Sequence, residues 1–365
     1  MAVHDESAHR KDRPIKGRGA KSNLPGRFEH SHTDPLDDGW YQEAEPSRAP
    51  ETIVKSETAR SILSLNESPD IPFDVSINPY RGCEHGCIYC YARPSHAYLE
   101  LSPGLDFETR LFFKQNAAEL LEKALRKRAY RCKAINLGAN TDPYQPIERK
   151  LKITRGLLEL MRDFYQPVTI VTKGSLVGRD IDILADMATK HLAAVMISVT
   201  TLNDALKRSM EPRTASPRMR LKVIQRLSAA GIPTGVIAAP MIPKINDHEL
   251  EAILDQSAAA GARFARYSLL RLPHEVAALF EEWLGEHFPD RAQAVMQRVR
   301  ATRDGKTHQS NFAERMHGTG EYADMLARRF SVRCRKLGLS TAERQALDTT
   351  RFSPPPLSGA QLELF

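Results

Sequence analysis

The feature that most constrains the fold of this chain is a regular alternation of apolar, strand-like runs with amphipathic helical runs between residues 73 and 285. The expected strands are 73–80, 134–137, 168–172, 193–199, 234–239 and 264–270. The expected helices are 116–128, 147–164, 180–190, 217–230, 247–260 and 274–285. Strand-helix units in series predict parallel strands covered by helices. Six units are too few to close an eight-stranded barrel but enough for an open one, so we expect an α/β fold compatible with a partial (βα)6 barrel of the TIM type.

The composition divides the chain into three parts. At 365 residues, with 41% apolar and 27% charged positions, it can build one large core with extensions. Prolines, glycines and mixed charges without hydrophobic periodicity predict a disordered N-terminal arm over residues 1–50. We expect the barrel to occupy residues 51–288 and a helical, basic C-terminal extension to occupy residues 289–365.

The positive charge is concentrated in that extension. The formal net charge is +7, and from Arg291 onward 13 Lys and Arg stand against 7 Asp and Glu. One interpretation is a surface that faces nucleic-acid phosphates, and the other is a solvated helix face; the sequence leaves both open. The densest cluster consists of Arg328, Arg329, Arg333, Arg335 and Lys336.

The sequence contains no membrane signal. No run of eighteen apolar residues occurs, and the first residues lack the apolar stretch of a secretory leader. We therefore expect a cytoplasmic protein without membrane contact, in a compartment where thiols stay reduced.

Three of the five cysteines, Cys83, Cys87 and Cys90, lie within eight residues. If each binds one iron of a 4Fe-4S cube, the fourth iron has no protein ligand and can bind a substrate or cofactor directly. Such an arrangement favours catalysis over simple electron transfer. The triplet directly follows the first expected strand, and chemistry in such barrels gathers at the carboxyl ends of the strands.

A structural zinc site is the main alternative for the triplet. A closed zinc site takes four ligands, so it would have to recruit His85, Cys132 or Cys334. His85 is only two residues from Cys83, which is a cramped spacing for two ligands of one ion. A disulfide framework is disfavoured because the chain is neither small nor preceded by a secretory signal.

The spacing Cys-x3-Cys-x2-Cys, with the aromatic Tyr89 before the last cysteine, resembles the signature of the radical S-adenosylmethionine enzymes. The resemblance implies that the open iron binds S-adenosylmethionine and that an electron from the cluster cleaves it, leaving a 5′-deoxyadenosyl radical. It also implies an electron donor of the flavodoxin or ferredoxin kind, and it places Tyr89 near the adenine. In that family an open three-quarter barrel carries the site.

Three further loops are expected to complete the cofactor site. Gly138, Ala139 and Asn140 begin a long loop after the second strand, which in the family contacts the methionine amino group through backbone carbonyls; an ordinary strand-to-helix turn is the alternative. Lys173 ends the third strand and could face a carboxylate, although a surface lysine is the common case. Ser198 ends the fourth strand, where its hydroxyl could bond a ribose.

The resemblance narrows to the branch of the spore photoproduct lyases over about residues 70–290. It is carried by the runs Asn78-Pro79-Tyr80-Arg81-Gly82-Cys83, Thr172-Lys173, Glu211-Pro212-Arg213 and Ala239-Pro240. By that similarity Lys173 and Ser198 match residues that contact S-adenosylmethionine, whereas Arg213 matches no assigned role. The lyases reverse a thymine dimer in DNA, so the branch implies chemistry on a nucleic-acid base.

One departure limits this implication. The lyases carry a hydrogen-donor cysteine in the loop after the second strand, and here that stretch has Asn140 and no thiol. Cys132 precedes the strand and Cys334 lies in the extension, so neither is expected at the site. Tyr91 or Tyr144 could relay a hydrogen atom instead, with packing as the simpler role for both. A radical enzyme acting on a small molecule or a protein, and a non-catalytic zinc module, therefore stay as alternatives, and the oligomeric state is open.

Overall fold

The computed structural model describes residues 16–28, 50–312, 314–342 and 347–356. Its main sheet has seven strands in the order β10-β9-β8-β7-β6-β3-β2. The last of these, β2 (Leu63–Leu65), is antiparallel to β3 at the sheet edge. All others pair in parallel: β3 (Val75–Ile77), β6 (Ile135–Leu137), β7 (Val168–Thr172), β8 (Ala193–Ser198), β9 (Thr234–Met241) and β10 (Phe264–Leu269). These are the six predicted strands, so the predicted fold class, a partial barrel of the TIM type, is confirmed.

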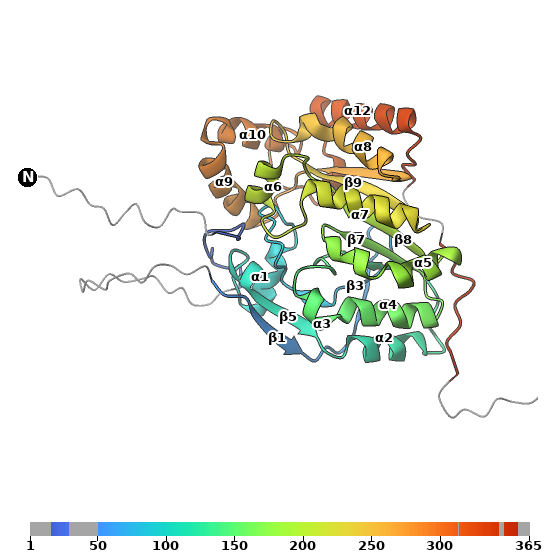
Figure 1. The fold of residues 1–365 in the computed structure, drawn as a ribbon. Coiled ribbons are helices and arrows are strands. Elements are labelled where there is room, and N and C mark those ends of the chain that lie inside the picture. Colours follow the sequence, from blue (N-terminus) through green and yellow to red (C-terminus); the bar gives the residue numbers. More distant parts are fainter. Residues whose placement is uncertain (1–15, 29–49, 313, 343–346, 357–365) are drawn as a thin grey trace, which may run out of the picture.

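A layer of helices covers the outer face of this sheet (Figure 1). Neighbouring helices follow the order of the strands, so that α2 lies beside α4, α4 beside α5, α7 beside α8, and α8 beside α12. This arrangement is what consecutive right-handed strand-helix crossovers produce. The helices that follow the strands are α2 (Ala117–Leu125), α4 (Ile153–Asp163), α5 (Ile181–Thr189), α7 (Pro217–Ala229), α8 (Leu250–Ala259) and α9 (Val276–His287).

The core lies between the sheet and these helices. Every residue of β8 is buried, and Ile77, Leu137, Ile170 and Val236 of other strands in the sheet are fully shielded from solvent. Strands buried on both faces show continuous apolar runs, which is why the sequence pattern located them. A second apolar cluster joins the cysteine loop to α9, where Ile88 packs with Leu279, Phe280 and Trp283.

Two expected elements differ in detail. The expected strand 73–80 is split into β3 and β4 (Tyr80–Arg81), which pair with different sheets. The expected helix 147–164 is two helices, α3 (Glu148–Leu151) and α4, separated at Lys152, whose φ of 53° is left-handed. At the start of the second helix, the buried Glu148 carboxylate accepts the Thr154 amide at 3.0 Å, one of the first amides of a helix that lack a partner within it.

A small second sheet supports the cysteine loop and was not expected. It has the order β1-β5-β4, with β1 (Ile53–Glu57) parallel and β4 antiparallel to β5 (Arg110–Lys114). Its strands β1 and β5 are partly exposed and pair over long sequence distances, so they leave little periodicity to detect. β4 leads through Gly82 directly into Cys83.

Part of the expected N-terminal arm is packed against the barrel. Residues 16–28, called the N-terminal strap below, lie beside the cysteine loop and α9, and Ala20 is buried. The Leu24 carbonyl accepts a hydrogen bond of 2.7 Å from Ser102. In this segment the chain therefore differs from a disordered arm; residues 1–15 and 29–49 lie outside the described part of the chain.

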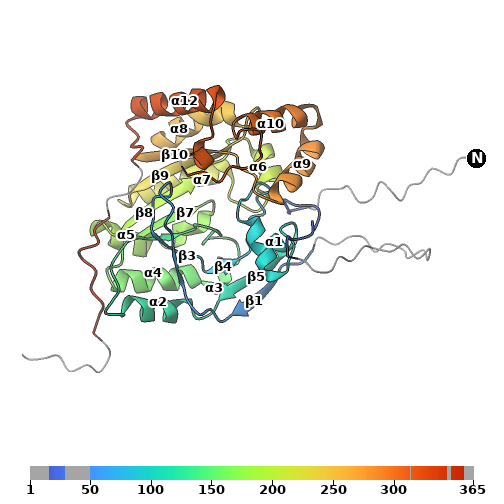
Figure 2. The same cartoon turned by 180° about the vertical axis from the view of Figure 1, so that it is seen from behind.

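The C-terminal extension contains α10 (Pro289–Ala301), α11 (Glu314–His317) and α12 (Glu321–Leu337). α12 continues the helical layer beside α8, and Figure 2 shows the two together from behind. After α12, Ser340 pairs with Phe264 and covers the free edge of β10. The domain boundaries at residues 50 and 288 stay predictions.

Two of the clustered arginines on α12 are held by carboxylates of α8. Arg329 pairs with Glu251 at 2.6 Å, and Arg333 pairs with Asp255. These two ion pairs help to join α12 to α8. This favours a solvated helix face over a surface whose arginines are free to bind nucleic-acid phosphates. In the described part of the chain, no helix has the length and apolar character needed to cross a membrane.

Candidate active site

The three cysteines lie on one buried loop after β4, at the carboxyl end of β3. Cys83 and Cys87 are 7% and 8% exposed, Cys90 is partly exposed, and all three are free thiols. Backbone turns close the loop, with the Gly86 amide donating to the Cys83 carbonyl at 3.4 Å and the Cys90 amide to the Cys87 carbonyl at 3.2 Å. The predicted placement at the carboxyl end of the first barrel strand is therefore what the structure has.

The electrostatic surroundings disfavour free thiolates. Burial raises the pKa of all three thiols, and negative neighbours add to it: Asp142 raises that of Cys83, and Glu211 raises that of Cys87. A cationic cluster would reverse this effect, because a metal centre stabilises the thiolate form of its ligands.

The residues present fit a cube with three protein ligands better than a zinc ion. His85, the nearest extra donor, has its Nδ1 3.3 Å from a carboxylate oxygen of Asp142. Cys132 donates to Gln166 near the amino ends of the strands, and Cys334 is buried in the main core. Among the described residues, no three His, Cys, Asp or Glu side chains are grouped to hold one metal ion. A cube takes one thiolate per iron and needs no such convergence on a single point.

Asp142 ties the cysteine loop to two barrel strands. Its carboxylate accepts from the Thr172 hydroxyl at 2.6 Å and the Lys173 amide at 2.8 Å, and it faces His85. Burial alone would raise the pKa of Asp142, but His85 and these hydrogen bonds outweigh it and lower the pKa to about 2. Next to it, Gln145 accepts from the Glu84 amide at 2.8 Å and so fixes the loop backbone.

Glu108 ties the same loop to the N-terminal strap. Its fully buried carboxylate accepts from the amides of Gly19 at 2.9 Å and Ala20 at 2.8 Å, and it pairs with Arg93. Arg93, also fully buried, donates to the Cys87 carbonyl at 2.9 Å. The strap passes so close that a Cβ on Gly19 would lie 1.7 Å from the Gly86 carbonyl oxygen. Only glycine permits this approach.

Glu211 is the third carboxylate around the loop, and it is fully buried. It accepts from Thr200 at 2.6 Å and pairs with Arg220, and the Tyr89 hydroxyl donates to it. Burial opposes ionisation, but Arg220 and then Lys173 outweigh it and lower the pKa of Glu211 to about 2. The sequence pattern did not identify Glu211, Glu108 or Asp142 as site residues.

Arg213, for which the sequence suggested no role, holds the other side of the loop. Its guanidinium pairs with Glu84 at 3.0 Å, and its amide donates to the His85 carbonyl at 3.3 Å. The preceding short helix α6 (Asp204–Met210) also contacts the loop, since the Ile88 amide donates to the Met210 carbonyl at 3.0 Å. A detectable signal for α6 is Asn203, whose side chain caps it.

The other predicted cofactor residues lie around the carboxyl ends of neighbouring strands. Lys173 Nζ donates to Ser198 Oγ at 2.7 Å, and it lies 5.9 Å from the centre of the Tyr89 ring. Gly138 has a φ of 92° and leaves no room for a side chain against the Val171 carbonyl. The structure thus brings Tyr89, Lys173 and Ser198 together.

The loop after β6 has its own contacts. The Asn140 amide donates to the Asn78 side chain at 2.9 Å, and the Ala139 carbonyl accepts from the Tyr91 hydroxyl. Of the two tyrosines considered as relays, Tyr144 is buried with its hydroxyl on Asp180, whereas Tyr91 is 44% exposed beside Cys90.

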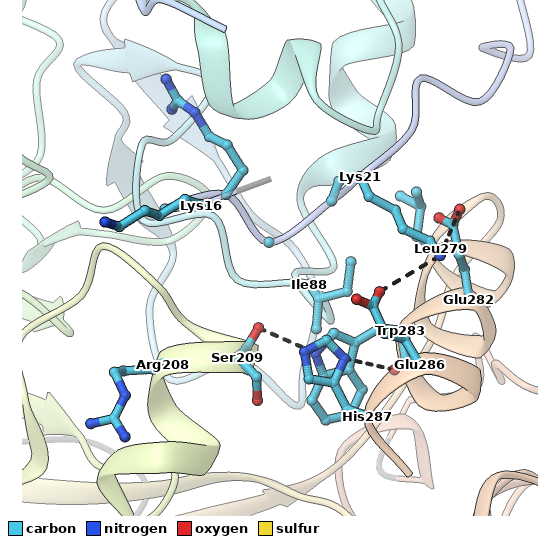
Figure 3. A pocket seen from close by; sticks show the side chains of 14 residues that line it. Lys16, Lys21, Ile88, Arg208, Ser209, Leu279, Glu282, Trp283, Glu286 and His287 are labelled. Atoms are coloured by element: carbon cyan, nitrogen blue, oxygen red, sulfur yellow. Dashed lines mark hydrogen bonds and ion pairs between the residues drawn. The ribbon is translucent and has the colours of Figure 1, made fainter. Parts of the chain in front are cut away.

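A cavity of about 170 Å³ lies on another side of the cysteine loop (Figure 3). It is bounded by the N-terminal strap, the end of α6 and α9, and among the described residues that line it Ile88 alone comes from the cysteine loop. Figure 3 shows Lys21 turned toward Glu282 and Glu286, at 3.9 and 3.6 Å. None of the three cysteines lines this cavity, so it is separate from the thiol site.

Two relatives are similar to this chain in sequence. An uncharacterized protein of Mycobacterium tuberculosis is 36% identical over 232 residues, which is 62% of this chain and 68% of that protein. An uncharacterized protein of Methanocaldococcus jannaschii is 26% identical over 222 residues, 60% of this chain and 78% of that protein.

Solved structures show the same fold. A structure of spore photoproduct lyase complexed with dinucleoside spore photoproduct superimposes with a TM-score of 0.58 at 15% identity, over 78% of this chain and 80% of that one. Residues 77–256 match the family described as the radical SAM superfamily, in which SAM is S-adenosylmethionine. The chain belongs to the radical SAM superfamily, whose members use a 4Fe-4S cluster and S-adenosylmethionine.

Proposed function

We propose that Cys83, Cys87 and Cys90 hold a 4Fe-4S cluster whose fourth iron binds S-adenosylmethionine, and that the protein is a radical enzyme. The observation that supports this most is the set of three free thiols on one buried loop at the carboxyl end of β3, with the nearby His85 already engaged by Asp142. When bound, the cluster supplies the electron that cleaves S-adenosylmethionine to a 5′-deoxyadenosyl radical. A flavodoxin-like or ferredoxin-like protein is the proposed source of that electron.

The chain's own residues have two tasks in this proposal. Buried pairs of charged residues around the loop fix its backbone so that the thiols are presented in one geometry. Lys173 and Ser198, 2.7 Å apart at the ends of β7 and β8, would bind polar groups of S-adenosylmethionine, with Tyr89 beside them. Gly138, Ala139 and Asn140 would contact its methionine part. In the structure the Tyr91 hydroxyl donates a hydrogen bond to the Ala139 carbonyl. Binding of the cofactor to that carbonyl would require this hydrogen bond to be shared with the cofactor or broken.

The decisive experiment is anaerobic reconstitution with iron and sulfide, followed by reduction and a search for 5′-deoxyadenosine. We expect a brown protein that forms this product. Cys83→Ala, Cys87→Ala and Cys90→Ala should each lose the cluster absorbance. Cys132→Ala and Cys334→Ala are the matched controls and should keep it. A colourless protein with stoichiometric zinc would instead support the non-catalytic metal module, and a full cluster without 5′-deoxyadenosine would count against the radical mechanism.

We propose a lyase-like reaction on a nucleic-acid base as the leading candidate for the substrate. Its support is the fold shared with spore photoproduct lyase, one structure of which is complexed with a dinucleoside. Against a full transfer of that activity, the loop after β6 has Asn140 and no cysteine, so any hydrogen return needs another group, such as the exposed Tyr91 next to Cys90.

A salt titration tests this candidate. A nucleic-acid substrate predicts binding of a short DNA or RNA that weakens steeply with salt. Cofactor cleavage without any such binding at low salt would favour the alternative, a small-molecule or protein substrate.

The free thiols of all five cysteines fit our further proposal that the protein works in the reducing cytoplasm.

A further inference from the structure

A stacked pair of side chains joins the two ends of the open barrel. Arg271 lies two residues after the end of β10, the last parallel strand, and Tyr91 directly follows Cys90 of the loop after β3, the first. The Arg271 guanidinium carbon lies 4.4 Å from the centre of the Tyr91 ring. A planar guanidinium on an aromatic face is held in one orientation with its N–H groups directed outward.

Arg271 is partly buried but has no acidic partner. In the described ranges no carboxylate lies within ion-pair distance of its guanidinium, which faces the Tyr91 ring, and Asp70 acts on it only from a greater distance. The nearby Arg315 is different, because it pairs with Asp70 at 2.6 Å. An unpaired charge that is partly removed from water is unfavourable unless something else compensates it.

A second arginine beneath Arg271 makes the region more positive. Arg303 is fully buried, and its guanidinium donates to the carbonyls of Leu270 and Arg315, at 2.8 and 3.0 Å. Burial, and then the charge of Arg271, lower its pKa to about 10. His308 responds to the same field: burial and then Arg271 and Arg303 lower its pKa to about 4. Burial is the larger cause of both shifts, and the positive charge around Arg271 adds to each of them.

We propose that Arg271, supported by Arg303 and oriented by Tyr91, binds an oxyanion of the substrate, a phosphate or a carboxylate, at the mouth of the barrel. Arginine binds both groups through two parallel N–H bonds. The site adjoins the cysteine loop because Tyr91 directly follows Cys90 in the chain, so a substrate held there lies next to the proposed cluster. The inference rests on the proposed function in placing the substrate at this mouth.

The test compares full-length wild type with Arg271→Gln, which removes the charge, and Arg271→Lys, which keeps it without the two-pronged geometry. Arg300→Gln is the matched control, because Arg300 already pairs with Glu281 at 2.8 Å. Melting temperature is measured with inorganic phosphate, acetate or chloride at constant ionic strength. Affinity for a fluorescent single-stranded oligonucleotide is measured by anisotropy.

We expect phosphate or acetate to raise the melting temperature of wild type and Arg300→Gln above the chloride value, and Arg271→Gln to lose that rise. A response to phosphate together with an oligonucleotide affinity about ten- to a hundredfold weaker in Arg271→Gln identifies a nucleotide phosphate. A response to acetate without that loss identifies a carboxylate. Arg271→Lys should retain part of the response.

Without added anion, Arg271→Gln should melt no lower than wild type, because it removes an uncompensated charge. Equal anion responses in wild type and Arg271→Gln, or a variant that only melts lower, would overturn the proposal. None of these measurements uses the cluster, so their outcome is independent of whether 5′-deoxyadenosine is formed.

Discussion

The buried ion pair behind the cysteine loop allows a quantitative test of how the loop is held. Glu108→Gln keeps the volume of the side chain but removes the charge that faces Arg93, and both side chains are 0% exposed. Removing one partner of a buried pair costs about 3–5 kcal/mol, because the other charge is left uncompensated. The amide also cannot accept from Gly19, Ala20 and Arg93 as two carboxylate oxygens do.

This cost converts into a melting shift. Unfolding entropy is about 2.1 cal/mol/K per residue, so 365 residues correspond to about 0.77 kcal/mol/K. A loss of about 3–5 kcal/mol therefore lowers the melting temperature by about 4–6 °C. Calorimetry of the metal-free protein measures this shift, and the reaction rate of the cysteine thiols with a colorimetric disulfide reagent should rise in parallel as the loop loosens.

Glu282→Gln is the matched control for the same strap. Glu282 accepts from Ser22 at 2.9 Å and lies 3.9 Å from Lys21, but its side chain is 31% exposed. Partly exposed ion pairs contribute about 0–1 kcal/mol, so this variant should shift melting by about 1 °C or less. If Glu108→Gln melts within 1 °C of wild type, or if both variants shift equally, the buried carboxylate does not hold the loop and the reasoning is refuted.

Three further outcomes are expected. Gly19→Ala should raise the reactivity of the cysteine thiols and lower the melting temperature, because its Cβ would overlap a facing backbone oxygen at 1.7 Å. Gly156→Ala in α4 is the control: its Cβ meets nothing within 4 Å, so it should stabilise the protein by about 0.5–1 kcal/mol. Burial lowers the pKa of His96 to about 4, so the unfolded chain binds more protons than the folded one between about pH 6.5 and 4. Stability therefore falls as the pH falls through that window. His96→Gln should flatten this part of the curve of melting temperature against pH. Arg333→Ala should leave oligonucleotide affinity within about twofold, since Asp255 already neutralises Arg333; a loss near tenfold would restore the phosphate-facing interpretation of the extension.

The sequence was most informative where burial leaves a pattern. The parallel strands appear as short apolar runs bounded by turn residues, and the helices between them keep one apolar face. The cysteine triplet was recognisable because its spacing is local. By contrast, β1 and β5 are half-exposed and pair across more than fifty positions, so their residues show no periodic signal.

The supporting residues of the site were missed for a different reason. A glutamate in a sequence is most often a surface residue, so burial was not expected for Glu108, nor for Glu211, although Glu211 stands in a run that carried the resemblance. Their roles depend on partners distant in the chain, such as Gly19, 89 residues away from Glu108. The unpaired state of Arg271 is likewise a property of the fold, because it depends on which carboxylates the fold brings near.

The separation between the loop's supports and the barrel mouth has an evolutionary consequence. Glu108, together with its partners in the N-terminal strap, holds the cysteine loop in place, whereas Arg271 belongs to the segment after β10. A substitution of Arg271 therefore leaves the contacts of Glu108 with Arg93 and Gly19 in place. Under the proposed function, descendants of such a protein could exchange one substrate for another while inheriting the same radical-generating apparatus, which is a route by which a single scaffold diversifies.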